Sequence, residues 1–188
     1  MKKLKVTIIG YGGMGSFHAK LIQANPEVEV HGIFDILESR QQAGEADGYS
    51  AYASLEEALN DACADTILIA TPNDVHKEIA VQALEAGKHV ICEKPVTLNS
   101  EELSEIMHTA KEHERVFMVH QNRRWDSDFQ MVKDLYENRK IGEVFHIESR
   151  VQGANGIPGD WRHLKAQGGG MLLDWGVHLL DQLLYMID

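Results

Sequence analysis

The segment GGGMLLDWGVHLLD, residues 168–181, carries three side chains that together suit proton transfer. Asp174 and His178 are four residues apart and Asp181 follows three later, so a helix would place all three on one side. Histidine beside a carboxylate forms a general acid/base pair, because the carboxylate orients the ring and stabilises its charged form. A structural histidine and a solvated polar stripe are the alternatives. No cysteine or second histidine nearby completes a zinc ligand set, so the pattern predicts no metal.

A second candidate is CEKPV, residues 92–96, which ends an apolar run. Lys94 in this position would polarise a substrate oxygen, and Pro95 would fix the backbone, with a cis bond as one option. Glu93 and Lys94 can equally be a charge pair that ends a strand before a turn. From these residues alone, the charge pair is the favoured interpretation.

The segment GYGGMG, residues 10–15, fits the spacing G-x-G-x-x-G between an apolar run and a helical stretch. Such glycines allow a tight turn, and the following helix N-terminus donates amides to a pyrophosphate. Asp35, twenty residues beyond Gly15, would accept hydrogen bonds from ribose hydroxyls and repel a 2′-phosphate, which favours NAD over NADP. Ser39 and Arg40 keep phosphate binding open. A Gly-rich turn, a methyltransferase loop and, for Asp35, a helix N-cap are the alternatives.

Two further segments carry polar side chains at the ends of apolar runs. TPND, residues 71–74, precedes His76, and a loop at the carboxyl end of a parallel strand faces the ligand crevice. Helix capping by Asn73 or Asp74, and a surface location for His76, are at least as well supported. QNRRWDSDFQ, residues 121–130, offers ligand contacts or, for its arginines, ion pairs with Asp126 and Asp128.

The elements that must position these residues alternate along the first two thirds of the chain. Short β-branched runs alternate with amphipathic stretches of helical period, which predicts a parallel sheet covered by helices. The expected strands are residues 4–9, 28–34, 66–70, 89–92 and 116–119. The expected helices are residues 15–25, 54–62, 74–87 and 100–114. Ser54 and Ser100 are the expected N-terminal caps, and Gly87 is the expected stop of the third helix.

The alternation of apolar runs and amphipathic stretches ends near residue 121, and a different sequence pattern begins. It suggests a helix over 128–142, an alternating strand over 143–152, a Gly-rich loop and a final helix over 171–188. One strand with so few helices cannot bury both of its faces, so this part is expected to be incomplete. The expected domains are 1–122, which binds the dinucleotide, and 123–188, the start of a substrate or oligomerisation domain.

Composition limits the classes of partner. The chain has 188 residues, 44% of them hydrophobic, and a formal net charge of -11 without a basic block, which argues against nucleic-acid and anionic-membrane partners. The N-terminal apolar run is too short for a signal peptide or a membrane span, so a cytoplasmic location is expected. Cys63 and Cys92 form no paired motif and are expected to be reduced. A small-molecule partner follows from these limits.

Five segments in order, GYGGMG, TPNDVH, EKPVTLN, HQNRRWD and GGGMLLDWGVHLLD, resemble the Gfo/Idh/MocA family of NAD(P)-dependent oxidoreductases. The resemblance implies the fold class α/β, with a doubly wound parallel Rossmann sheet followed by a partial α+β domain with an open antiparallel sheet. It implies an active site between the two domains. It also implies hydride transfer between NAD, or less readily NADP, and the hydroxyl-bearing carbon of a sugar, inositol or related polyol.

Carried over residue by residue, Lys94 matches the family's catalytic lysine, Asp174 its active-site acid and His178 its general acid/base. Glu93 matches a residue that contacts the nicotinamide ribose. The full set of expected cofactor contacts is Gly10, Gly12, Gly13, Met14, Gly15, Asp35, Thr71, Pro72, Asn73, His76, Glu93 and Asn122. The expected substrate contacts are Lys94, Arg123, Trp161, Arg162, Asp174 and His178.

The chain departs from the family at its end, because members are typically much longer and continue with several more strands. A homo-oligomer is expected if that sheet is completed. The alternative function is a dinucleotide-binding module without turnover, or an inactive truncated paralogue. If the chain is complete, its final helix should expose an apolar face.

Overall fold

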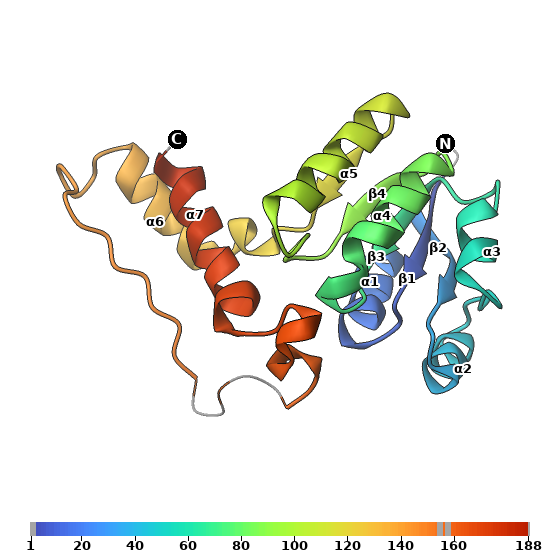
Figure 1. Ribbon diagram of the computed structural model, residues 1–188. Helices are drawn as coiled ribbons and strands as arrows, with labels where there is room; N and C mark the ends of the chain where they lie inside the picture. Colours follow the sequence, from blue (N-terminus) through green and yellow to red (C-terminus); the bar gives the residue numbers. More distant parts are fainter. Residues whose placement is uncertain (1–2, 154–155, 157–158, 188) are drawn as a thin grey trace. The chain divides into compact units, whose positions relative to one another are not determined.

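A computed structural model describes residues 3–153, 156 and 159–187 (Figure 1). The chain divides into two compact units, Met1–Val119 and His120–Asp188. The first unit carries the sheet, and the regular elements described in the second unit are helices and helical turns. No described helix combines the length and apolar character needed to cross a membrane.

The first unit is built on a parallel sheet of five strands in the order β2-β1-β3-β4-β5. The strands are β1 (Leu4–Ile9), β2 (Val28–Phe34), β3 (Thr66–Ile69), β4 (His89–Cys92) and β5 (Phe117–Val119). The chain steps outward from β1 to β2 and then returns to β3 on the other side of β1. In open α/β sheets, ligands bind at the carboxyl ends of the strands beside such a reversal, here β1 and β3. The expected strands are confirmed to within one residue at each end.

Five helices accompany the sheet: α1 (Gly13–Gln23), α2 (Glu38–Ala46), α3 (Leu55–Asn60), α4 (His76–Glu85) and α5 (Ser100–Glu112). Helix α2 was not predicted, because its only buried residue is Gly44 and it therefore lacks an apolar stripe. The Ser54 cap is confirmed, since its hydroxyl accepts from the Glu57 amide. The cap of α5 is Asn99 and not Ser100. Gly87, with φ 77°, follows α4 as predicted.

The core of this unit lies on both faces of the sheet. Successive residues of a strand point to opposite faces, so Ile67 and Ile69 pack in one cluster and Leu68 packs in the other. The first cluster includes buried residues of α3, α4 and α5, and the second includes Ala19 of α1. Helices on both faces of a parallel sheet confirm the doubly wound α/β fold.

The two edges of the sheet differ in their backbone pairing and length. Along β2, Ile33 donates its amide to Ser50 and its carbonyl accepts from Tyr52, so the segment between them pairs with this edge. At the opposite edge, β5 contains only three residues, Phe117–Val119. The β2 edge is thus paired at the carboxyl end of the strand, and the opposite edge is short.

The second unit contains two helices, α6 (Ser127–Glu137) and α7 (Val177–Ile187), which pack against each other. The ring centroids of Phe129 and Tyr185 lie 6.4 Å apart at this contact. The predicted strand over 143–152 is wrong, because none of these residues pairs with a strand. An alternating sequence becomes a strand only where a neighbour satisfies its backbone groups. The predicted last helix begins instead with a π-helical turn, Leu172–Gly176, and its final residue is outside the described part.

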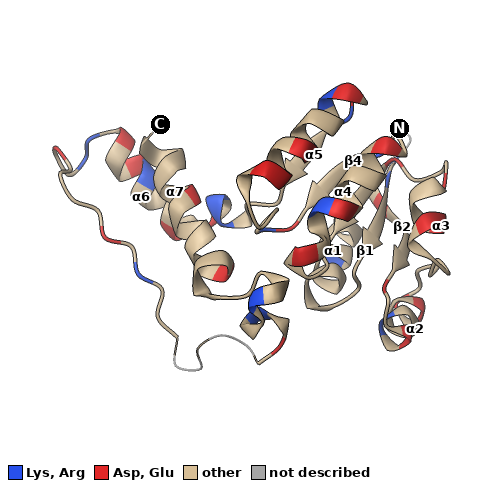
Figure 2. Ribbon diagram, in the orientation of Figure 1, with Lys and Arg blue, Asp and Glu red and all other residues tan. Residues whose placement is uncertain are grey.

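Acidic and basic residues are spread over the chain and form no block of one charge. Figure 2 shows acidic and basic positions interspersed along the helices, in line with 29 acidic and 18 basic residues in the whole chain. Cys63 is exposed and Cys92 is buried, and neither forms a disulfide, as predicted. Burial raises the pKa of the Cys92 thiol, so this cysteine is unreactive.

Candidate functional site

The glycine loop between β1 and α1 depends on two of its glycines for close backbone contact. A Cβ atom on Gly15 would lie 2.0 Å from the Gly10 carbonyl oxygen, and Gly10 itself has φ 92° and adjoins the Ala70 backbone. A Cβ on Gly13 would meet no atom within 4 Å. The loop is therefore packed tightly on its inner side and open at the first turn of α1.

Asp35, directly after β2, is tied to this loop. Its Oδ2 atom accepts the Tyr11 amide at 2.8 Å, and its Oδ1 atom accepts the Leu37 amide at 2.9 Å. The residue at the N-cap of α2 is Leu37, so the N-cap interpretation of Asp35 is wrong. The carboxylate is buried, with Arg40 Nη1 3.5 Å from Oδ2. A Cβ on Gly12 would lie 3.1 Å from the same Arg40 atom, so a guanidinium lies beside both the acid and the loop.

The segment after β3 is organised by His76, which is completely buried. Its Nδ1 and Nε2 atoms lie 2.9 Å from the carbonyl oxygens of Pro95 and Thr71, respectively. The surface interpretation of His76 is therefore wrong, and no side chain caps α4, which begins at this residue. Burial, outweighing the two carbonyls, lowers the pKa of His76. A neutral ring donates one proton and so bonds fully to one of the two loops.

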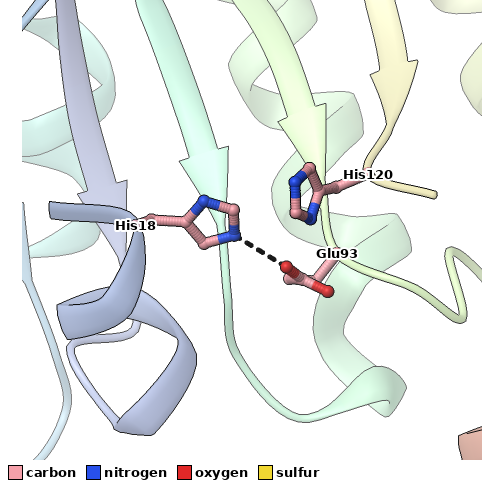
Figure 3. Close-up of side chains that lie close together, drawn as sticks. All are labelled: His18, Glu93 and His120. Carbon is pink, nitrogen blue, oxygen red and sulfur yellow. Dashed lines mark hydrogen bonds and ion pairs between the residues drawn. The ribbon is translucent and has the colours of Figure 1, made fainter. Parts of the chain in front are cut away.

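The segment after β4 holds a buried carboxylate. Glu93 accepts a hydrogen bond from His18 Nε2 to its Oε1 atom at 2.7 Å (Figure 3). The Lys94 amide lies 3.2 Å from Oε2. The bond between Lys94 and Pro95 is cis, which confirms that option. Carboxyl ends of four parallel strands thus bring together the glycine loop, Asp35, the Thr71 segment and the Glu93 segment.

His18 was missed among the site residues. The signal was available in its position, because Gly15, His18 and Ala19 share one face of α1 at helical spacing and all three are buried against the sheet. The glycine fingerprint is defined by glycines alone, so it does not include the polar residue His18 on the same helix face.

The acid/base segment of the second unit departs from a simple helix face. Asp174 lies in the π-helical turn, and its Oδ1 atom is 3.6 Å from Arg162 Nε. His178 is buried, with its ring edge-on to Trp175 and centroids 6.0 Å apart. Asp181 instead accepts two hydrogen bonds from Arg124, at 2.7 and 2.6 Å. In the contacts described, Asp174 lies beside Arg162, His178 lies beside Trp175, and Asp181 pairs with Arg124.

The triple glycine accommodates the preceding turn. A Cβ on Gly169 would lie 2.2 Å from the Arg162 carbonyl oxygen, and the same oxygen accepts the Gly170 amide at 2.9 Å. Arg162 also stacks on the Trp161 ring and donates to Asp160 at 2.6 Å. The glycines thus place Arg162 beside Asp174.

The segment QNRRWD forms a 3₁₀ turn, Asn122–Trp125, anchored on α7. Arg123 pairs with Asp126 at 2.8 Å and lies over the Trp175 ring at 4.3 Å from its centroid. The expected partner of Arg124 is wrong, since its guanidinium pairs with Asp181. This pairing, with both Asp181 oxygens, raises the pKa of Arg124. Arg124 is therefore structural, whereas Arg123 remains beside the acid/base segment.

The residues of the first unit fit a dinucleotide. The open first turn of α1 has no side-chain cap, so its amides are available to an anion. Asp35 presents a buried carboxylate beside the same loop, which suits ribose hydroxyls. The close backbone contacts of Gly10 and Gly15 are those of a loop that binds phosphate, and a metal site would not require them.

Comparisons with known proteins agree with this arrangement. Residues 4–121 match the family described as "Oxidoreductase family, NAD-binding Rossmann fold", and residues 129–188 match the GFO/IDH/MocA C-terminal domain. The crystal structure of an NAD-binding protein from Listeria innocua is 61% identical with a TM-score of 0.97, and covers all of this chain and 56% of that chain.

Among the curated relatives are dehydrogenases with named substrates. The scyllo-inositol 2-dehydrogenase (NADP(+)) of Bacillus subtilis (strain 168) is 32% identical over 97% of this chain and 51% of its own length. The D-glucoside 3-dehydrogenase of Escherichia coli (strain K12) is 31% identical over 98% of this chain and 54% of its own length. The chain thus spans about half the length of these two relatives.

Proposed function

The chain belongs to the GFO/IDH/MocA family of oxidoreductases, and from this premise we propose that it transfers a hydride between NAD(P) and the hydroxyl-bearing carbon of a sugar, inositol or related polyol. The observation that carries the proposal is the packed glycine loop with the buried Asp35 carboxylate bonded to its Tyr11 amide. This combination provides amides for a pyrophosphate and an acceptor for ribose hydroxyls.

The proposed chemistry assigns separate tasks to the protein. The dinucleotide, when bound, supplies hydride exchange at its nicotinamide ring. His178 accepts the proton of the substrate hydroxyl as the carbon is oxidised, and returns it in the reverse direction. Lys94 stabilises the oxygen as its negative charge develops. Asp174, placed beside Arg162, accepts a hydrogen bond from a neighbouring substrate hydroxyl.

The substrate class is supported by the relatives named above. One acts on scyllo-inositol and another on a D-glucoside, both of which carry several hydroxyl groups on a ring. The polar side chains around Asp174 suit such a substrate, because carboxylate and guanidinium groups bond to hydroxyls as acceptor and donor. We propose a polyhydroxylated ring as the substrate class.

Two neighbouring side chains, Asp35 and Arg40, have opposite effects on the choice between NAD and NADP. Asp35 disfavours the 2′-phosphate of NADP, while Arg40, 3.5 Å away, would favour it. We propose NAD as the preferred cofactor, because Asp35 is fixed by two backbone amides and cannot turn away readily.

The test is calorimetric titration with NAD and NADP, followed by a panel of inositols, sugars and sugar acids monitored for reduced nicotinamide. His178→Ala should bind NAD as the unchanged chain does and lose about 100-fold or more in turnover. His146→Ala is the matched control, because His146 is an exposed histidine of the same unit and should leave both measurements unchanged.

Each result separates the proposal from its alternatives. Turnover that depends on His178 supports a dehydrogenase. Tight NAD binding without turnover on the whole panel supports a non-catalytic binding module. Absence of NAD and NADP binding would contradict the assignment of the glycine loop.

A further inference from the structure

Glu93 is held from two directions within the first unit. His18 Nε2 bonds to Oε1 (Figure 3). The Lys94 amide lies near Oε2, so both carboxylate oxygens have a fixed neighbour. The side chains of His18 and Glu93 are each only 6% exposed. Because an ionised carboxylate can only accept, His18 Nε2 is the donor in this pair. A buried carboxylate requires such a partner, and the pair therefore fixes the orientation of Glu93.

We propose that His18 is a positioning residue that orients Glu93 to accept hydrogen bonds from the hydroxyls of the nicotinamide ribose. The inference rests on the proposed dinucleotide binding and adds a residue outside the recognised motifs. Each carboxylate oxygen has two acceptor positions, so a carboxylate bonded to His18 and to the Lys94 amide can still accept from a pair of neighbouring hydroxyls.

The helix that carries His18 is well suited to this task. Gly15, one turn earlier on the same face, packs against the Gly10 backbone and fixes α1 on the loop. The N-terminus of α1 is proposed to bind the pyrophosphate, and His18 extends from the same rigid helix to Glu93. One element thus positions groups for two successive parts of the dinucleotide.

Two amide substitutions separate positioning from packing. In His18→Gln the side-chain nitrogen can occupy the place of Nε2 and keep the bond to Glu93. In His18→Asn the same amide group is one methylene shorter, so the donor no longer reaches Oε1. The two variants have the same chemistry and differ in reach, which makes Gln the matched control for Asn.

The ligands are ADP and ADP-ribose, which differ by the terminal ribose that Glu93 is proposed to bind. Calorimetry should show ADP-ribose binding about 10-fold more weakly to His18→Asn than to the unchanged chain, since a hydrogen bond to a charged group is involved. His18→Gln should stay within about 2-fold, and ADP should bind equally to all three. Thermal unfolding of each variant verifies that it is folded.

The double variant His18→Asn, Glu93→Gln tests whether His18 acts through Glu93. On the Glu93→Gln background, the His18 substitution should cause little further loss of ADP-ribose affinity. Equal losses for ADP and ADP-ribose, or unchanged ADP-ribose binding by a folded His18→Asn, would overturn the positioning role while leaving the proposed function intact. Failure of the unchanged chain to bind NAD, ADP and ADP-ribose would overturn both.

Discussion

At the scale of single residues, the glycine loop shows how a missing side chain can be a structural requirement. Gly15 and Gly13 are two residues apart, yet an added Cβ would lie 2.0 Å from a backbone oxygen at the first and in open space at the second. The pattern G-x-G-x-x-G marks Gly15 but leaves Gly13 in a variable position. The spacing in the sequence and the packing in the structure therefore agree.

Gly15→Ala should consequently destabilise the protein by about 1–3 kcal/mol or more, because the backbone of a packed loop must move to accept the methyl group. The same change should greatly weaken NAD binding. Urea unfolding and calorimetry measure the two effects.

Gly13→Ala is the control, since its methyl group meets no atom and alanine favours a helix. Its unfolding free energy should be unchanged or slightly higher. Equal stability of the two alanine variants would show that Gly15 does not pack against Gly10 as described.

Polar residues of the site were predictable to different degrees. Asp35 and the glycines were identified because a known spacing links them to one ligand. His76 was found, although its burial between two loops was not, because its partners are backbone carbonyls of residues 71 and 95. Every residue has a backbone carbonyl, so the residue types do not reveal which carbonyls His76 contacts.

At the scale of elements, a hydrogen-bonded cluster connects β2 to the end of α3. Asp61 Oδ2 accepts from the Tyr52 hydroxyl at 2.7 Å and lies 3.0 Å from His31 Nε2. The Tyr52 bond first, and the Cys63 amide second, lower the pKa of Asp61 to about 2. Burial, followed by the bond to Asp61, raises the pKa of Tyr52 to about 12.

Stability should therefore fall at both extremes of pH. The folded pKa of Asp61 is below its ordinary value, so its contribution is present above pH about 4 and is lost as the pH falls toward about 2. The folded pKa of Tyr52 is above its ordinary value, so its contribution is lost as the pH rises from about 10 to about 12. Each contribution is on the order of 1 kcal/mol, because partial exposure screens it.

Asp61→Asn should weaken the fall in unfolding free energy between pH about 4 and about 2, measured by urea unfolding at each pH. Tyr52→Phe should remove the alkaline loss and part of the acid loss, because His31 and the Cys63 amide still bond to Asp61. Unchanged acid dependence in Asp61→Asn would contradict the depressed pKa.

Element types were predictable where local pattern decided them, and not where neighbours did. The five strands followed from buried β-branched runs. The segment 143–152 alternates like a strand but has no strand beside it, and α2 forms without an apolar stripe. The π-helical turn, Leu172–Gly176, was not predicted either, because the apolar spacing of this segment fits an ordinary α-helix.

At the scale of the whole molecule, the last helix exposes apolar side chains. Leu180, Leu184 and Ile187 follow helical spacing along α7 and are 54%, 61% and 58% exposed. Apolar residues at this spacing form a stripe that water solvates poorly.

The native chain should therefore bind the fluorescent dye ANS on α7. Changing Leu180 and Leu184 together to Gln should reduce the ANS fluorescence severalfold without lowering thermal stability, because both side chains are already exposed. Leu21→Gln, at an exposed leucine of α1, is the control and should leave most of the signal. Dye binding that persists in the double variant would place the apolar surface elsewhere.

The two edges of the sheet affect how readily the protein would aggregate at high concentration. An unpaired strand edge is a template on which another chain can extend the sheet, and such growth leads to aggregation. Here Ser50 and Tyr52 occupy the hydrogen-bonding positions beside Ile33 of β2. At the other edge, β5 has only three residues with which another chain could pair. The carboxyl end of β2 and the short β5 should therefore be poor templates for such growth.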